Sequence, residues 1–333
     1  MKKYPPVLTA ALLALSLANG RGAATQAAEP WQIAVIPKGT THEYWKAVQA
    51  GAVKAERELN AAGVPVHVIW KGPLKEDDRE QQIQVVENFI GRRVSAIVIS
   101  PLDSNALIAP LATAVQGGIP VVTIDSGLNS PLPACYVATD NREGGRVAAR
   151  TLAGLVGPHG RVLMLRNATG SANTEEREEG FLEAMHREFP GIKLVSTDQH
   201  GGVTRDNAYR TGQNLLNRFG HELDGVFACN QPTTAGLLLA LRDAGLAGGK
   251  VKFVGFDTGV VELAALKAGD VSALMVQDPF GMGYLGVKNA VAVLRGETVP
   301  KVIDTGVTVV TRENLAVPAV HALVNPPLDE YLK

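Results

Sequence analysis

The sequence alternates, along almost its whole length, between short apolar runs and longer amphipathic segments. Runs such as residues 33–36 and 96–100 have the length and composition of buried strands, and each leads into a segment with apolar residues at helical spacing. Regular strand–helix alternation predicts parallel sheets with right-handed crossovers and helices on both faces. The chain is therefore expected to be an α/β protein.

This alternation also repeats. Residues 97–125 run from strand through polar loop and helix to a second strand that ends in Asp125, and residues 225–257 repeat that order and end in Asp257. Two segments of one architecture predict two similar, doubly wound lobes, each near the usual domain size. The repeat would place both aspartates at equivalent strand ends, facing a shared cleft in which a small molecule can bind.

Composition narrows the class of protein. The 333 residues are 46% hydrophobic and 20% charged, with a net charge of −1, which is typical of a globular protein and gives no basic surface for nucleic acid. Residues 1–28 have the pattern of a secretory signal peptide, with Lys2 and Lys3 before an apolar segment that is too short to span a membrane. We therefore expect an exported protein.

The sequence offers few signals for chemistry. Cys135 and Cys229 lie in separate apolar strand-like runs and are expected to be buried free thiols, although two cysteines of an exported protein could pair. No cysteine pair at metal spacing and no GxSxG nucleophile motif occurs. We therefore expect no metal, no cofactor and no enzymatic activity.

One motif points toward an exported NAD-type enzyme. Gly281, Gly283 and Gly286 form GxGxxG after a strand, with Asp304 at about the spacing of a dinucleotide fingerprint. However, Pro279 intervenes, and too little chain follows to complete such a domain. Close helix packing is the favoured explanation for these glycines.

Polar residues at the predicted strand ends are the candidate ligand contacts. Carboxylates there can accept hydrogen bonds from hydroxyl groups, and amides can both donate and accept. The alternatives are that Trp45 belongs to the core, that the two aspartates form turns, and that the polar segment 169–177 only caps a helix. Arg205 is added because the positive end of a helix disfavours a cation, so an arginine near a helix start suggests a ligand or an ion pair. The candidates are Lys38, Thr40, Tyr44, Trp45, Asp125, Ser126, Asn173, Arg177, Arg205, Asn230, Asp257 and Gln277.

Several motifs, in order, resemble the periplasmic sugar-binding proteins of the ribose-binding type, relatives of the lac repressor core. The resemblance covers about residues 31–310 and implies a type I periplasmic binding fold, with lobes of residues 29–139 plus 278–306 and 140–277 plus 307–333 joined by a hinge. It also implies capture of a sugar in the periplasm for the permease of an ABC importer. We expect the protein to act as a monomer. The motifs are Tyr44–Trp45, GIPVVTIDS, ATDNREGG, EREEGF, GVFACN, FVGFDT and MVQDP.

The resemblance also assigns roles. Tyr44 and Trp45 match the aromatic residues that sandwich the sugar, Asp125 matches the carboxylate of the first lobe, and the polar set of the second lobe is Asn230, Asp257 and Gln277. The family's ribose binders have arginine where this chain has Ser126, a second arginine near Thr174–Glu175 and an aromatic residue near Val203. This chain lacks both cations and the ring at those places, so ribose itself is not expected.

The ligand is therefore predicted to be a small sugar, a polyol or a sugar-like molecule. The segment Pro37–Lys38 is similar to one in the autoinducer-2 receptor, which keeps a signal receptor as the alternative. Lys38 and Arg205 would either replace the missing cations or meet an acidic ligand.

Overall fold

The computed structural model describes residues 1–3 and 29–332. Nearly all of the predicted signal peptide, residues 1–28, therefore lies outside the described residues. Among the helices of the described part, none is both long and apolar enough to cross a membrane.

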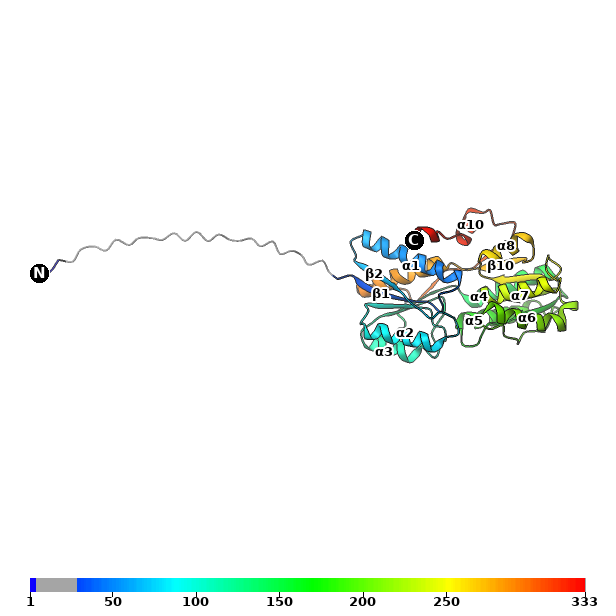
Figure 1. The fold of residues 1–333 in the computed structure, drawn as a ribbon, viewed down its shortest axis with the longest axis horizontal. Helices are drawn as coiled ribbons and strands as arrows, with labels where there is room; N and C mark the ends of the chain where they lie inside the picture. The colour runs from blue at the N-terminus through cyan, green and yellow to red at the C-terminus, as the bar shows by residue number, and fades with distance from the viewer. Residues whose placement is uncertain (4–28, 333) are drawn as a thin grey trace.

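The first lobe is built on a parallel sheet of order β11-β5-β4-β3-β1-β2. Alternate strand residues face opposite layers: Ile33 and Val35 pack toward α1 (Glu43–Ala61) and α9 (Pro279–Leu294), whereas Ala34 and Ile36 pack toward α2 (Arg79–Gly91) and α3 (Ile108–Gln116). Figure 1 shows α1 above the sheet and α2 and α3 below it. The strands are β1 (Trp31–Ile36), β2 (Val66–Trp70), β3 (Ala96–Ile99), β4 (Val121–Ile124), β5 (Cys135–Ala138) and β11 (Val302–Asp304).

The second lobe repeats this plan with the sheet order β12-β10-β9-β8-β6-β7. Two helices, α4 (Asn141–Val156) and α5 (Ala172–Glu188), cover one face, and α6 (Arg205–Phe219), α7 (Gln231–Asp243) and α8 (Val260–Ala268) cover the other. Its strands are β6 (Arg161–Leu165), β7 (Lys193–Ser196), β8 (Gly225–Ala228), β9 (Lys252–Phe256), β10 (Ala273–Val276) and β12 (Thr308–Val310). The predicted pair of similar lobes is confirmed, except that β12 runs antiparallel to β10.

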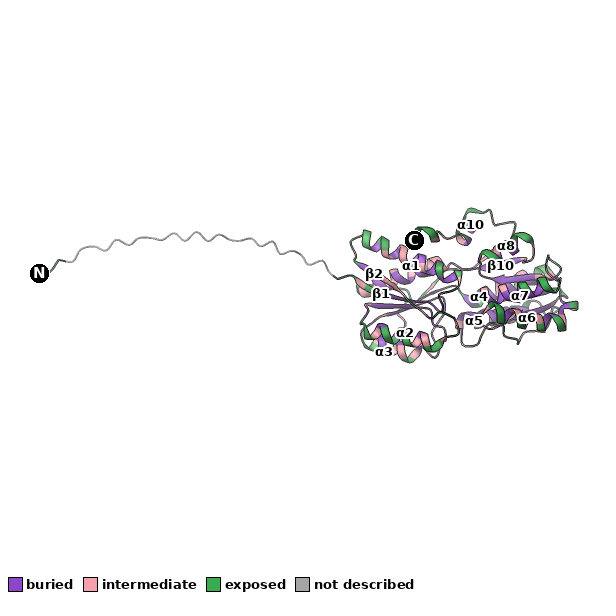
Figure 2. Ribbon diagram, viewed as in Figure 1, coloured by how far each residue is buried: buried purple, intermediate pink, exposed green. Residues whose placement is uncertain are grey.

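The central strands of both sheets are buried between their helices (Figure 2). Cys135 lies in the core of the first lobe and Cys229 in that of the second, and both are buried free thiols, as predicted. The chain makes a turn between β3 and α3: Asp103 accepts from the backbone N–H groups of Asn105 and Ala106, and α3 starts only at Ile108.

Glycines bring two pairs of helices into backbone contact. A Cβ atom on Gly283 of α9 would lie 1.9 Å from the carbonyl oxygen of Val48 in α1, and one on Gly51 would lie 1.9 Å from that of Phe280. Gly145 and Gly180 allow the same approach between α4 and α5 in the second lobe. Two glycines of the GxGxxG motif therefore have a packing role, since a Cβ atom on Gly286 would lie 2.8 Å from both Ile124 and Val98. A Cβ atom on Gly281 would instead meet the carboxylate of Asp278, which caps α9.

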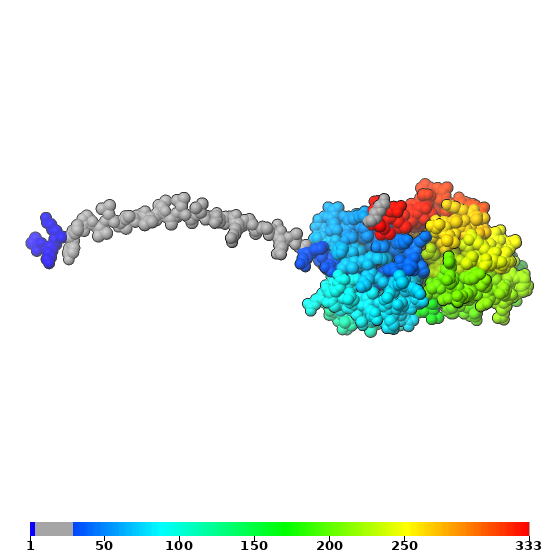
Figure 3. Space-filling model, viewed as in Figure 1, coloured from blue at the N-terminus to red at the C-terminus, as the bar shows by residue number. Residues whose placement is uncertain are grey.

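The chain passes between the lobes at three places. These are β5 to α4, β10 to α9, and the short link from β11 to β12. After them, α10 (Pro318–Val324) packs on the core of the second lobe, but α11 (Leu328–Tyr331) contacts α1 in the first, where Arg57 donates to the carbonyl of Glu330. The end of the segment 307–333, which the sequence analysis gave to the second lobe, thus lies against the first, and Figure 3 shows this C-terminal segment along both lobes.

Candidate functional site

Asp125 and Asp257 occupy equivalent positions at the ends of β4 and β9. Their φ angles are +61° and +67°, and Arg93 is the only other non-glycine residue with positive φ in the described chain. Each backbone N–H donates to the neighbouring strand, at 3.0 Å to Val137 and 2.8 Å to Met275. Aspartate tolerates this left-handed conformation better than most residues, and such backbone strain gathers at functional sites. The internal repeat of the sequence is thus reproduced at the level of single residues.

The carboxylate of Asp125 accepts hydrogen bonds from side chains of both lobes. In the first lobe, the Tyr44 hydroxyl donates to Oδ1 at 2.8 Å and the Ser100 hydroxyl donates to Oδ2 at 2.7 Å. From the second lobe, the Asn173 amide donates to Oδ1 at 3.1 Å. Asp125 therefore joins the lobes through its side chain, beyond any role in the turn that follows β4.

Lys38 lies beside Asp125 and also connects the lobes. Its side chain is 5% exposed, and Nζ lies 3.7 Å from Asp125 Oδ2. The same ammonium donates to Ser171 Oγ and to Asn173 Oδ1, both at 2.9 Å. Burial lowers the pKa of Lys38, and the nearby Asp125 carboxylate opposes that shift.

Asp257 is held in a similar way by residues of the second lobe. The Gln277 amide donates to Oδ1 at 2.7 Å, and Arg177 Nη1 lies 3.8 Å from Oδ2. Arg177 is itself fixed, since Nε donates to Asn141 and its guanidinium lies 4.0 Å over the Phe256 ring. Burial raises the pKa of Asp257 to about 6, and Arg177 and Gln277 only partly offset that effect.

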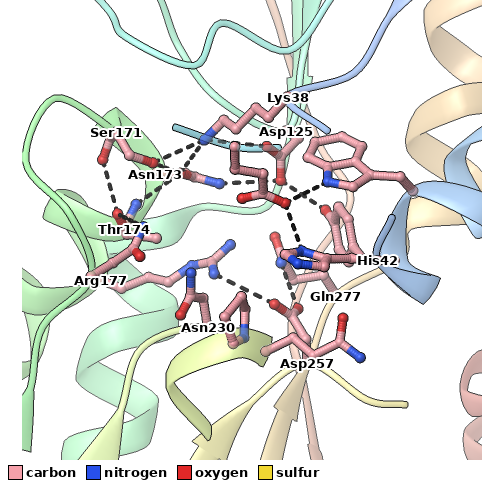
Figure 4. Close-up of a pocket in the computed structure, with 16 residues that line it drawn as sticks. Lys38, His42, Asp125, Ser171, Asn173, Thr174, Arg177, Asn230, Asp257 and Gln277 are labelled. Carbon is pink, nitrogen blue, oxygen red and sulfur yellow. Dashed lines mark hydrogen bonds and ion pairs between the residues drawn. The ribbon is translucent and has the colours of Figure 1, made fainter. Parts of the chain in front are cut away.

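These side chains face one cavity between the lobes (Figure 4). Nine of the predicted ligand residues line it: Lys38, Tyr44, Trp45, Asp125, Asn173, Arg177, Asn230, Asp257 and Gln277. The cavity is also lined by residues that the sequence analysis did not select, namely His42, Glu76, Asn167, Ser171, Thr174, Gln231 and Pro232.

Three predicted ligand residues do not line this cavity. The Thr40 hydroxyl donates instead to the carbonyl of Pro73, and Ser126, which follows Asp125 in the chain, is fully buried. Arg205 has an exposed side chain 3.7 Å from Asp206, and it lines a separate surface groove. Its position at the start of α6, which suggested a ligand, is explained by this exposed setting, where water screens the helix dipole.

Glu76 is the most consequential residue missed. A run of consecutive charged residues such as 75–79 is typical of a solvated face, yet the Glu76 side chain is only 13% exposed. Its Oε1 accepts from Trp45 Nε1 at 2.6 Å and bonds His42 Nδ1 at 2.9 Å. An irregular loop has no periodicity, so no signal in the sequence marked this one side chain as pointing inward.

Four buried polar atoms of the lining residues have no hydrogen-bond partner within the described chain. Such atoms are rare in folded proteins, and each one needs an explanation. A ligand with several hydroxyl groups would supply the missing partners. The atoms are Arg177 Nη2, Asn167 Oδ1, Gln231 Oε1 and Gln277 Oε1.

Charges in the cavity occur as opposed pairs. Lys38 faces Asp125, Arg177 faces Asp257, and His42 faces Glu76. Within the described residues, no three histidine, cysteine or acidic side chains are grouped so as to hold a metal ion. The arrangement is suited to binding through hydrogen bonds, since Lys38 and Arg177 each already face a carboxylate.

Two similar α/β lobes that enclose a polar cavity define the architecture of a solute-binding protein. The chain belongs to the periplasmic binding protein family, because the model of a periplasmic binding protein domain matches residues 33–298.

Individual relatives support this family assignment. The ribose import binding protein RbsB of Bacillus subtilis is 30% identical over 78% of this chain and 81% of its own length. A carbohydrate transporter solute-binding protein from Agrobacterium radiobacter, solved with D-arabinose, is 36% identical with a TM-score of 0.84, over 89% of this chain and 99% of the other. An ABC transporter solute-binding protein from Agrobacterium vitis, solved with D-fucose, is 31% identical with a TM-score of 0.83. The match covers 88% of this chain and 100% of the other.

Proposed function

We propose that this protein captures a small neutral sugar or polyol between its lobes and delivers it, chemically unchanged, to the permease of an ABC importer. The observation that carries the proposal is the pair of carboxylates, Asp125 and Asp257, at equivalent strand ends on one cavity. A carboxylate accepts two hydroxyl hydrogen bonds, and charge-assisted bonds of this kind are stronger than neutral ones. Relatives named as ribose import binding proteins, and structures solved with sugars, support the same ligand class.

The paired charges favour a neutral ligand over an acidic one. Each cation of the cavity, Lys38 and Arg177, already lies opposite a carboxylate, and the exposed Arg205 is outside it. A sugar acid would bring a further negative charge to Asp125, Asp257 and Glu76, with no free cation to meet it. Burying an unpaired charge is costly, so sugar acids are expected to be excluded.

Aromatic and polar side chains would contact different parts of the sugar. Tyr44 and Trp45, whose rings meet edge to face at 5.1 Å, would cover the C–H face of a sugar ring. The amides and carboxylates would pair with its hydroxyl groups. A micromolar dissociation constant corresponds to about −8 kcal/mol. Several charge-assisted bonds of about 1.5–3 kcal/mol each, less the cost of closing the lobes, can supply that free energy.

The setting proposed for this activity is the periplasm. Residues 1–28 would direct export, and the mature protein would act as a monomer, without nucleic acid and without enzymatic turnover. Closure of the lobes around the sugar would provide the surface that the permease reads, because the sugar stabilises the closed form over the open one.

A thermal-shift screen of the protein without residues 1–28 tests this function. D-arabinose, D-fucose, D-ribose, D-allose and xylitol should be compared with D-galacturonate and D-gluconate. A sugar at 100 times its dissociation constant adds about 2.7 kcal/mol of stability, which corresponds to roughly 5–10 °C in Tm. We expect a shift of that size with at least one neutral compound and none with the acids. A shift with the acids alone would contradict the proposal.

A further inference from the structure

Two loops of the first lobe are packed together where they border the cavity. One is residues 37–42, which follow β1, and the other is residues 71–78, which follow β2. A Cβ atom on Gly72 would lie 2.8 Å from the Pro37 ring, and one on Gly39 would lie 2.9 Å from Glu76 Cγ. The Thr40 hydroxyl donates to the carbonyl of Pro73 at 3.3 Å. The second loop is thereby fixed against the first.

Glu76 is the one side chain of the second loop that lines the cavity. Both of its hydrogen bonds use Oε1, with Trp45 Nε1 at 2.6 Å and His42 Nδ1 at 2.9 Å. A bond to a carboxylate is charge-assisted, and a buried indole N–H left without its acceptor is costly. The Trp45 ring therefore cannot rotate without losing this partner.

This restraint extends across the wall of the cavity. The Trp45 ring meets the Tyr44 ring at an interplanar angle of 86°, and the Tyr44 hydroxyl donates to Asp125 at 2.8 Å. Glu76 thus connects, through two aromatic rings, to the carboxylate proposed to bind the sugar.

We propose that Glu76 is a positioning residue, which fixes the Trp45 indole and the His42 imidazole and so shapes the aromatic wall of the binding cavity. Its effect on sugar affinity rests on the function proposed above, whereas its effect on Trp45 does not. The electrostatics agree: the bond to Glu76 raises the pKa of His42, with a smaller contribution from Glu262 of the second lobe. Burial alone would raise the pKa of Glu76, but the bonds from His42 and Trp45 and the charges of His42 and Lys38 together outweigh it, and the net shift is downward.

The first arm of the test uses no sugar. In a background with Trp31→Phe and Trp70→Phe, Trp45 is the sole tryptophan. Glu76→Ala should move the fluorescence emission of Trp45 to longer wavelength and increase its quenching by acrylamide. Glu76→Gln keeps an acceptor oxygen, so its emission and quenching should stay close to those of the parent. Gly39→Ala, which displaces Glu76 Cγ, should shift the emission in the same direction as Glu76→Ala. Glu87→Ala, an exposed glutamate of α2, is the matched control.

Unchanged Trp45 emission in Glu76→Ala would overturn the proposal. The same variant should lower the His42 pKa in an NMR titration, which a general loss of stability would not do.

The second arm is calorimetry with D-arabinose. Loss of one charge-assisted hydrogen bond predicts about tenfold weaker binding in Glu76→Ala than in Glu87→Ala. Equal affinity of the two variants for D-arabinose would contradict the role in binding. If D-arabinose did not bind the parent protein, D-arabinose would be excluded as the ligand. The Trp45 emission would still decide the role of Glu76.

Discussion

Replacing Asp257 with alanine should weaken sugar binding by a factor of roughly 100 or more, the largest loss expected from any single change in the cavity. The substitution removes two acceptor oxygens, and charge-assisted bonds contribute about 1.5–3 kcal/mol each. It also leaves Arg177 opposite no carboxylate in a buried site. Calorimetric titration with the sugar that gives the largest shift in the screen measures the effect.

Two further variants make this result specific. Asp257→Asn keeps the shape of the side chain and removes only the charge, so its affinity should lie between those of the parent and the alanine variant. Asp77→Ala removes an exposed carboxylate outside the cavity and should leave the affinity unchanged. If Asp257→Ala bound the sugar as tightly as Asp77→Ala, the assigned role of Asp257 would be wrong.

Because the pKa of Asp257 is raised, the affinity for the sugar should depend on pH. With a pKa of about 6, the carboxylate is ionised above that pH, and the affinity should fall as the pH drops through 6. The bond to Glu76 raises the pKa of His42, another titratable group of the cavity, so the pH profile of Asp257→Asn serves as the reference. The folded pKa exceeds the unfolded value of about 3.9, so this group costs stability above pH 6, and the cost disappears as the pH falls toward 4.

Gly283→Ala should have the largest effect on stability. The new methyl carbon would lie 1.9 Å from the Val48 carbonyl oxygen and 3.1 Å from the Ala52 nitrogen, so α1 and α9 would have to separate. Overpacking of this kind costs about 3 kcal/mol or more. We expect the melting temperature, followed by circular dichroism, to fall by roughly 6–12 °C.

Gly154→Ala is the matched control for this prediction. Gly154 lies in α4, and a Cβ atom there would meet nothing within 4 Å. Alanine is a better helix former than glycine, so this variant should gain about 0.5–1 kcal/mol. Equal melting temperatures for the two variants would contradict the close-packed interface between α1 and α9.

Much of this architecture was predictable from residue patterns. Apolar runs located the strands of both sheets other than β11 and β12, because buried parallel strands are apolar on both faces. The repeated order of strand, loop, helix and aspartate predicted that Asp125 and Asp257 would face one cleft, and they line the same cavity. Tyr44, next to the apolar stripe of α1, was likewise predicted to face the cavity.

The remaining features depend on contacts between distant segments. Glu76 enters the cavity because Gly39 and Gly72 let two loops pack closely, and neither contact leaves a pattern in the charged run 75–79. The antiparallel strand β12 and the return of α11 to the first lobe depend on where the chain lies after its third crossing. Arg205 was misleading because a cation at a helix start has little cost when solvent screens it.

A crystal structure of the protein with its tightest-binding neutral sugar would test the central claim most directly. The account predicts that the sugar lies between the lobes, with hydroxyl oxygens within about 2.5–3.0 Å of the carboxylates of both Asp125 and Asp257. It also predicts that the sugar is chemically unchanged. A sugar bound to one lobe alone, or bound away from both carboxylates, would contradict the account.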